Sequence, residues 1–594
     1  MTRVRTFIPH DVVFPGEPST FEAFRDLLRT LSRTDTLMWC ARFNHTLENR
    51  GHHDEHFIQN RAARRFLGDV HLERINAWAR RERRSLAGTR MFSRVQLVEL
   101  TCWVALVCED HPDDGNTFEL ESTRVGFTRA ALLATEAWSA SVYDERFGSS
   151  GDPISDRVRA AAVLRRAMAI SSSRVDLLEA IARGASIFDD AMRSRRPELE
   201  RLFREASGLT FDEYLAIASA LAMLYTADAA DVLESNSALF DVSRIGEHLC
   251  PAARSKVPAF LDLISQTPEE LAAALQRDDP DGSLRWGVKR SYRVVRDKPL
   301  LRVSRGRVIV LDPGMMCDAI STGPLFAALR VAPKGFANTL FGAFGNGVEA
   351  YVQRLALGMY PAAPSLAPRV VLNPTSSTKK KGEAEELCDL VIHGAGGIAL
   401  VETKGVFIRD EDVLSADPAA FPNAIRKQYA NPPSKGDRAK GVPQLVRAIS
   451  RLASGDAQLV GLRAGMTIYP VLVTLDDLVS APGTRDILHA AFAKALGADA
   501  GRFPFRLRSI YVAQLIVMTV ADVELLDRVV ETTELLDVLR EYAKAGPAHS
   551  FHDHLVANQT AYGVEIHGRQ VTEIAEAAMD RAKDFLFGST EADG

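Results

Sequence analysis

The sequence predicts a multidomain α+β protein, in which an all-helical N-terminal half precedes an α/β domain and a helical C-terminal tail. The chain has 594 residues, several times the ~150 residues of a typical domain. Residues 1–282 repeatedly place apolar side chains three and four positions apart, as amphipathic helices do. From residue 283 onward, short runs of β-branched residues bounded by Gly and Pro predict strands, with helical stretches between them.

The composition indicates an ordinary globular protein. Hydrophobic residues make up 46% and charged residues 25% of the chain, with a formal net charge of −5. No apolar stretch reaches the ~18–20 residues of a membrane helix, and the N-terminus lacks a signal-peptide pattern, so we expect a cytoplasmic protein without membrane contact. The six Cys form no CxxC pair, which weighs against disulfide scaffolds and thiolate zinc sites.

In the N-terminal half, the helical pattern is clearest at residues 21–33, 95–107 and 175–188. Thr210 and Glu213 form a capping-box pattern ahead of another apolar run. The polar stretch 278–283 predicts a domain boundary, and we therefore assign 1–282 to the first domain. A sensor, an oligomerisation module and a DNA clamp all remain open as its role.

The second half is divided into three parts. Residues 283–334 are expected to form a β-rich connecting segment, with strands at 291–297 and 300–313. Residues 335–520 are expected to form the α/β domain, with a hairpin at 386–404. Residues 521–594 return to helical periodicity and form the tail.

The expected hairpin places three charged residues on one face. Its two apolar strands flank residues 394–397, whose glycines permit a tight turn. The antiparallel register through that turn places Asp389 directly opposite Glu402. Because side chains alternate along a strand, Lys404 then lies on the same face as Glu402.

Such a face needs a compensating cation. Opposed carboxylates ~5 Å apart repel by roughly 3 kcal/mol at an effective dielectric constant of ~20. Asp389, Glu402 and the backbone carbonyl of Thr403 offer hard oxygen ligands suited to Mg²⁺ or Mn²⁺. Lys404 could hold a water and stabilise charge on phosphorus. The alternative, a surface ion pair at a strand edge, is disfavoured because both strands are apolar runs.

These residues resemble a known signature. Asp389 is followed, after twelve intervening residues, by Glu402-Thr403-Lys404. This pattern resembles the motif of the PD-(D/E)XK, or restriction-endonuclease-like, nucleases. Cys388 stands in place of the Pro for which the motif is named, and that Pro contributes no chemistry. The resemblance covers roughly residues 335–520 and implies a restriction-endonuclease-like α/β core with the order αβββαβ.

Two flanking positions add to the resemblance. In many members of that family, a Glu on the helix before the sheet joins the metal ligands, and Glu349 occupies the matching place on an expected helix at 345–361. Gln444, at the start of a helix expected at 443–454, matches a Gln that recurs in the resembling subgroup. The resemblance therefore implies the catalytic set Glu349, Asp389, Glu402, Lys404 and Gln444.

A nuclease binds a polyanion, and contacts of Lys and Arg with phosphates supply most of the non-specific affinity. Residues 425–451 contain seven basic residues against the single acid Asp437, although the whole chain is acidic. The residues expected to contact nucleic acid are Lys379, Lys380, Lys381, Arg426, Lys427, Lys435, Arg438, Lys440 and Arg447. The alternative is that they are solvated surface charges. No recognisable module for reading a base sequence is present.

The expected function is a Mg²⁺- or Mn²⁺-dependent nuclease, with DNA as the favoured substrate. The fusion to a large helical half resembles bacterial anti-phage effectors, in which the extra domain senses a trigger or holds a homo-oligomer or partner protein. A DNA repair nuclease is one alternative. A catalytically silent nucleic-acid-binding or sensor protein is another.

A zinc peptidase is a third alternative, because His52 to His56 has the His-x-x-Glu-His spacing of inverted zinc peptidases. Gly51 and its polar neighbours indicate a loop or helix start, whereas such a peptidase needs the motif inside a packed helix. The chain has neither a P-loop motif nor a Gly-x-Ser-x-Gly elbow, which removes the common NTPase and serine-hydrolase interpretations.

Overall fold

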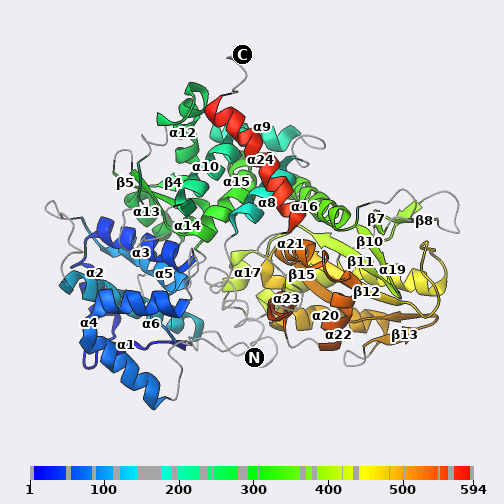
Figure 1. The fold of residues 1–594 in the computed structure, drawn as a ribbon, viewed down its shortest axis with the longest axis horizontal. Helices are drawn as coiled ribbons and strands as arrows, with labels where there is room; N and C mark the ends of the chain where they lie inside the picture. Colours follow the sequence, from blue (N-terminus) through cyan, green and yellow to red (C-terminus); the bar gives the residue numbers. More distant parts are fainter. Residues whose placement is uncertain are drawn as a thin grey trace.

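The protein is described from a computed structural model, and it is a mixed α+β protein with a helical N-terminal half (Figure 1). The coarse fold class expected from the sequence is therefore confirmed. No helix in the described ranges is long and apolar enough to cross a membrane. The structure describes residues 6–48, 55–82, 89–110, 121–143, 176–189, 197–227, 239–241, 247–278, 292–304, 307–361, 369–377, 384–415, 417, 419–431, 441–480, 482–498, 503–545, 549–558 and 568–588.

The first part of the N-terminal half is built around a core of aromatic rings. The ring of Phe43 lies 4.5 Å from that of Phe92 and 4.9 Å from that of Phe66, measured between centroids. The helices around this core are α1 (His10–Val13), α2 (Phe21–Leu28), α3 (Arg33–Glu48), α4 (Glu55–Arg81), α5 (Arg94–Val107) and α6 (Glu121–Tyr143), with strands β1 (Thr6–Phe7) and β2 (Thr89–Arg90) paired in parallel.

A second group of helices follows. The helices expected at 21–33, 95–107 and 175–188 are all present. The first two are α2 and α5 of the first group, and the third is α8 of this group. The expected capping box is also present, because the amide of Glu213 donates to Oγ1 of Thr210 (3.2 Å) and the amide of Thr210 to Oε2 of Glu213 (2.7 Å). The helices of this group are α8 (Leu177–Asp189), α9 (Pro197–Ser207), α10 (Phe211–Ala227), α12 (Pro251–Ile264) and α13 (Pro268–Asp278).

The connecting segment differs in part from its expected β-rich character. The prediction of a strand at 291–297 is wrong, because a short helix, α14 (Arg293–Asp297), forms there. This helix buries Val295 in the N-terminal core. Tertiary packing thus outweighs the β preference of Val. A long helix, α15 (Pro313–Val331), also lies in this segment and begins at Asp312, whose Oδ1 accepts from the amide of Met315 (3.0 Å).

The strands of this segment form a small sheet together with two short strands from residues 1–282, so the N-terminal half is not all-helical as expected. The order of this sheet is β3-β6-β5-β4, and β5 pairs with β6 as an antiparallel hairpin. The strands are β3 (Leu239–Asp241), β4 (Ser265–Gln266), β5 (Leu300–Ser304) and β6 (Arg307–Val310). The expected boundary at residue 282 falls between 279 and 291, outside the described residues.

A seven-stranded mixed sheet forms the centre of the second half. Its order is β13-β14-β12-β11-β10-β7, and β15 also pairs with β12. Strand β10 is antiparallel to both of its neighbours, β7 and β11, whereas β11 and β12 are parallel. The strands are β7 (Val370–Leu372), β10 (Leu390–Gly394), β11 (Gly397–Lys404), β12 (Thr467–Thr474), β13 (Phe505–Leu507), β14 (Ile510–Val512) and β15 (Ile516–Thr519); β8 (Thr375–Ser377) and β9 (Ala384–Glu386) form a separate pair.

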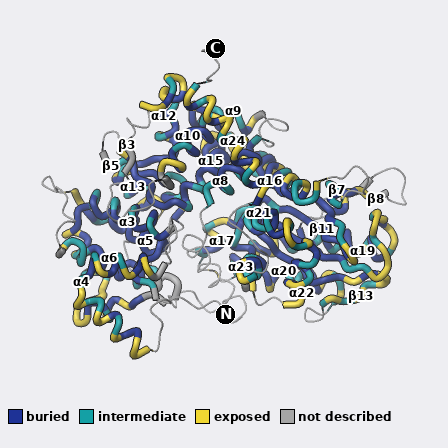
Figure 2. Tube along the Cα trace, viewed as in Figure 1, coloured by how far each residue is buried: buried dark blue, intermediate teal, exposed yellow. Residues whose placement is uncertain are grey.

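Each face of this sheet packs into a different core, as the alternation along β11 requires. Val401 points into a core shared with α16 (Ala337–Met359), α21 (Val520–Val529), α22 (Leu535–Ala545), α23 (Phe551–Ala557) and α24 (Arg569–Phe587). Leu400 points into the other core, which is built with α17 (Asp410–Leu414), α18 (Ala420–Ile425), the π-helical turn η5 (Arg426–Ala430), α19 (Val442–Ser454), the 3₁₀ turn η6 (Asp477–Ser480) and α20 (Pro482–Leu496). Figure 2 shows much of the chain in this sheet as buried.

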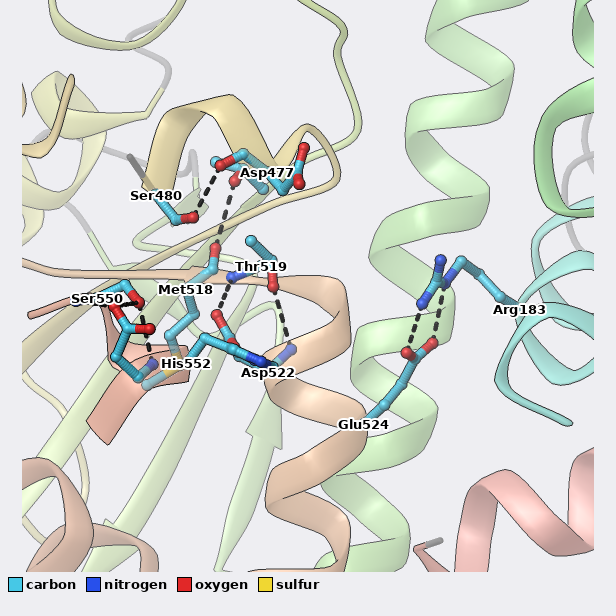
Figure 3. A network of polar contacts seen from close by, with 11 residues as sticks. Arg183, Asp477, Ser480, Met518, Thr519, Asp522, Glu524, Ser550 and His552 are labelled. Carbon is cyan, nitrogen blue, oxygen red and sulfur yellow. Dashed lines mark hydrogen bonds and ion pairs between the residues drawn. The ribbon is translucent and has the colours of Figure 1, made fainter. Parts of the chain in front are cut away.

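The helical half and the sheet are joined by buried contacts. Helix α24 packs against α8, α10 and α16, so the C-terminal tail touches both halves (Figure 1). Arg183 of α8 donates through Nε (3.0 Å) and Nη2 (2.5 Å) to the carboxylate of Glu524 on α21, which is 1% exposed (Figure 3). The hydroxyl of Tyr351 on α16 donates to the same carboxylate (2.9 Å).

Candidate active site

The hairpin of β10 and β11 has the register that its sequence predicts. Leu390 pairs with Val401, and Gly394 pairs with Gly397 across the turn. Gly396 in that turn has a φ of 81°, a left-handed conformation that glycine adopts without strain. The same register places Asp389, immediately before β10, beside Glu402 of β11.

Asp389 is held by hydrogen bonds on three sides. Its amide donates to the carbonyl of Val401 (3.1 Å), and its Oδ2 accepts from the amide of Thr403 (2.6 Å). Its own carbonyl accepts from the amide of Asn373 (2.8 Å). Asp389 is 6% exposed and Glu402 is fully buried, so two carboxyl groups lie together away from solvent.

Lys404 supplies the positive charge in this group. Its Nζ lies 2.5 Å from Oε1 of Glu402 and donates to the carbonyl of Thr403 (2.9 Å). The amide of Gly441 makes a longer contact with the same Oε1 (3.4 Å). The second carboxylate oxygen of Glu402, Oε2, is buried without a hydrogen-bond partner. An unsatisfied buried carboxylate oxygen is costly and favours a further cation or proton.

Burial dominates the protonation of this group. It raises the pKa of Glu402 to about 8, against the lowering effect of Lys404, and Asp389 adds to the rise. Burial likewise raises the pKa of Asp389, partly offset by Lys404. Burial disfavours the ammonium of Lys404, but the carboxylates of Glu402 and Asp389 outweigh it and raise the pKa of Lys404. The site therefore gains from additional positive charge.

Helix α16 approaches the end of β11 closely. A Cβ placed on Gly405 would lie 2.9 Å from both Cα of Gly345 and Cβ of Val348, so only glycine fits after Lys404. The ring of Phe407 then packs on that of Phe344, with centroids 5.8 Å apart. These contacts set the distance between α16 and β11, the strand that carries Lys404.

Glu349 follows Val348 on α16 and is half-buried near the site. Its charge is among those that raise the pKa of Lys404. One turn further along, Nε2 of Gln353 donates to Oε1 of Glu349 (3.1 Å) and to the carbonyl of Asp389 (3.1 Å). Gln353 was not predicted from the sequence, although its spacing of four residues from Glu349 on a helix indicates a shared face.

Gln444 lies in the first turn of α19 and is half-buried. Three residues before it, Gly441 contacts Glu402 through its amide. Gly441 has a φ of 62° and a ψ of −129°. A Cβ on Gly441 would lie 2.7 Å from the carbonyl oxygen of Tyr429, so a side chain there is excluded. Gly441 was also missed from the sequence, and its position two residues before the helix expected at 443–454 was the available signal.

Cys388 replaces the Pro of the resembling motif without entering the chemistry. It is fully buried, its Sγ–H donates to the carbonyl of Leu390 (3.3 Å), and burial raises the pKa of its thiol well above the usual range. The thiol is therefore protonated and does not act as a ligand near neutral pH.

The residues present fit a hard divalent cation with few protein ligands. Within the described ranges, no group of three or more His, Cys, Asp or Glu side chains is arranged to hold a metal. Two buried carboxyl groups, one of them with an unpartnered oxygen, and the carbonyl of Thr403 nevertheless form an oxygen-rich set. Such a set suits Mg²⁺, which keeps several waters and needs only one or two carboxylates.

The expected nucleic-acid contacts are only partly described. Arg426 and Lys427 are exposed on η5, where Nη1 of Arg426 donates to Oδ1 of Asn423 (3.3 Å), and Arg447 is exposed on α19. Arg451, from the same basic segment, donates to Oγ of Ser376 on β8 (2.8 Å). The expected contacts that lie outside the described residues are Lys379, Lys380, Lys381, Lys435, Arg438 and Lys440.

The alternative zinc site is likewise outside the described part of the chain. His52 and His53 lie between described ranges, and the side chain of His56 is not described. Comparison of the chain with protein-family models, with curated proteins and with solved structures found no match. The function is therefore inferred from the residues of the hairpin and their surroundings.

Proposed function

We propose that this protein is a Mg²⁺- or Mn²⁺-dependent nuclease that hydrolyses phosphodiester bonds, with DNA as the favoured substrate. The observation that carries the proposal is the buried pair Asp389 and Glu402, opposed across a hairpin, with Lys404 on the same face. Apart from the separate pair β8–β9 and the short elements α17, α18 and η5, the chain order is α16, β7, β10, β11, α19, β12. This order supports the proposal, because it resembles the αβββαβ order of the restriction-endonuclease-like core.

The roles of the residues follow from their positions. Asp389 and Glu402 would hold the metal together with the carbonyl of Thr403, and Glu349 would join them from α16. A bound Mg²⁺ would supply Lewis acidity, which lowers the pKa of a water and offsets charge on the phosphate. Lys404 is the group that can donate to that water and to the phosphate, once its ammonium turns away from Glu402.

The exposed basic residues would attract a polyanionic substrate to this face of the sheet. Arg426 and Lys427 on η5 and Arg447 on α19 lie on elements that pack beside β11 and on the same face of the sheet. Each phosphate that a protein neutralises adds ~0.9 to the slope of log affinity against log salt. Replacing Arg447 by Ala should therefore lower the measured slope by about that amount if Arg447 binds a phosphate.

The substrate class is tested by incubating the protein with supercoiled, linear and single-stranded DNA and with RNA, each with Mg²⁺ and with EDTA. The proposal expects cutting of DNA only with the divalent ion. Cutting of RNA alone would retain the mechanism and change the substrate. Binding of DNA without cutting of any substrate would favour the silent binding protein.

The biological setting is a separate part of the proposal. A role in anti-phage defence remains our preferred setting, and DNA repair is the alternative. The buried contact of Arg183 with Glu524 supports a helical half that communicates with the sheet, because it joins α8 to a helix packed on the sheet. Protection of cells against phage infection, lost in Asp389→Asn, would support the defence setting.

A further inference from the structure

One side chain links two of the proposed metal ligands. Gln353 lies on α16 and reaches toward the start of β10, where its Nε2 is 3.1 Å from Oε1 of Glu349 and 3.1 Å from the carbonyl oxygen of Asp389. The same Nε2 lies 3.0 Å from Oδ1 of Asn373, so its two hydrogens are shared among three acceptors. Glu349 belongs to helix α16, and Asp389 directly precedes strand β10.

Asp389 depends on such contacts because it precedes the regular ladder of β10, which begins at Leu390. Its carbonyl accepts from the amide of Asn373 (2.8 Å) and from Gln353. Its carboxylate accepts from the amide of Thr403 (2.6 Å). The contact from Gln353 therefore adds a side-chain donor to a carbonyl that the amide of Asn373 already contacts, and it links this backbone to α16.

Glu349 depends on Gln353 in a different way. It is half-buried on a helix and has three side-chain torsions, so holding it toward the hairpin costs conformational entropy. Gln353, four residues later on the same face, donates to its carboxylate and limits the positions it can take. A hydrogen bond to a carboxylate also favours its charged form, the form that binds a metal.

We propose that Gln353 is a positioning residue, which holds the carboxylate of Glu349 near the backbone of Asp389, so that Glu349 can move onto a metal once Asp389 and Glu402 bind it. This inference rests on the proposed function. It accounts for a site in which Asp389 and Glu402 are buried together, while Glu349 is held by Gln353 and acts on the same Lys404. Outer contacts of this kind typically change metal affinity by about 10–100-fold.

The test is calorimetry of Mn²⁺ binding to the full chain without nucleic acid, which separates metal affinity from activity. Gln353→Met keeps the length of the side chain and removes its donor. We expect Mn²⁺ affinity to fall by about tenfold in this variant. The matched control is Gln276→Met, the same change at an exposed glutamine of α13, which should leave the affinity unchanged.

A double-mutant cycle distinguishes positioning from general destabilisation. Glu349→Gln alone should weaken Mn²⁺ binding, and adding Gln353→Met should weaken it by less than the two single effects multiplied. Thermal unfolding of Gln353→Met in EDTA should match that of the control within the error of the measurement. Multiplicative losses, or unchanged affinity in Gln353→Met, would overturn the inference.

The wild-type protein separates this inference from the proposed function. If it binds Mn²⁺ and cuts DNA while Gln353→Met binds Mn²⁺ equally well, only the role of Gln353 is wrong. If the wild type neither binds Mn²⁺ nor cuts any substrate, the proposed function and the role of Gln353 are both wrong.

Discussion

The ammonium of Lys404 lies 2.5 Å from Oε1 of Glu402, whose side chain is fully buried. The same ammonium donates to the carbonyl of Thr403. Lys404 therefore contacts two of the oxygens proposed to bind the metal. Once Glu402 is ionised, the lysine neutralises the buried carboxylate, and a bound cation would compete with it for the same oxygens.

This competition predicts opposite effects of Lys404→Met on chemistry and on metal binding. DNA cutting should fall by about 10²–10⁴-fold, because the variant lacks the group that donates to the reacting water and phosphate. Mn²⁺ affinity, measured by calorimetry, should stay equal or increase. The control is Lys494→Met at an exposed lysine of α20. Weaker Mn²⁺ binding in Lys404→Met would show that the ammonium does not compete with the metal.

The raised pKa of Glu402 predicts a pH dependence of stability. Its pKa rises from 4.5 to about 8 on folding, so between these pH values the unfolded chain releases a proton that the folded chain retains. In EDTA, the free energy of unfolding should therefore decrease as pH rises through this window, as far as this group contributes. Urea denaturation across the window should show a smaller decrease in Glu402→Gln.

The same titration predicts how metal binding depends on pH. A metal binds the ionised carboxylate, so binding must displace the proton of Glu402. Mn²⁺ affinity should rise with pH until about pH 8 and then level off. Calorimetry in buffers of different ionisation enthalpy should detect proton release below that pH. Affinity that does not change with pH across this range would contradict the raised pKa.

Gly441→Ala tests the tight packing beside Glu402. A Cβ at this residue meets the carbonyl of Tyr429 at 2.7 Å, and the φ of 62° is itself unfavourable for Ala. We expect a loss of about 2–4 kcal/mol in the free energy of unfolding, from strain and displaced packing. Gly455→Ala is the matched control, because Gly455 has a φ of 74° but open space around its Cβ. Equal losses in the two variants would contradict the close approach.

The ion pair between the halves should show the behaviour of a buried pair. Arg183→Met leaves the carboxylate of Glu524 buried without its cation, which should cost about 3–5 kcal/mol in urea denaturation. The double variant Arg183→Met/Glu524→Leu removes both charges and should recover at least half of that loss. A double variant less stable than Arg183→Met would show that the pair itself, and not its imbalance, provides the stability.

The site was predictable from the sequence where local rules determine it. The glycines at 394–397 fix the turn, the turn fixes the register, and the register places Asp389 beside Glu402. Glu349 could be placed near the hairpin only through the resemblance of its helix to a known family. What brings α16 close is the contact of Gly405 with Gly345 and Val348, which depends on residues far apart in the chain.

Other features depended on tertiary contacts that no local pattern carries. Two such contacts are the ion pair of Lys404 with Glu402 and the hydrogen bond from Gln353 to the carbonyl of Asp389. Both depend on how the side chains pack in the folded protein. The strand expected at 291–297 became a helix because Val295 packs into the N-terminal core. The pairing of β15 beside β12 was likewise not anticipated, since strand order arises only when the sheet assembles.

Metal-dependent cutting is tested by titrating Mg²⁺ against the rate of plasmid cutting, for the wild type, Asp389→Asn and Glu402→Gln. For a nuclease that works through these carboxylates, the wild-type rate rises from zero with Mg²⁺ and is lower by at least about 10²-fold in both variants at every concentration. Cutting by the wild type in EDTA, or cutting by Asp389→Asn at the wild-type rate, would contradict a metal site at Asp389 and Glu402.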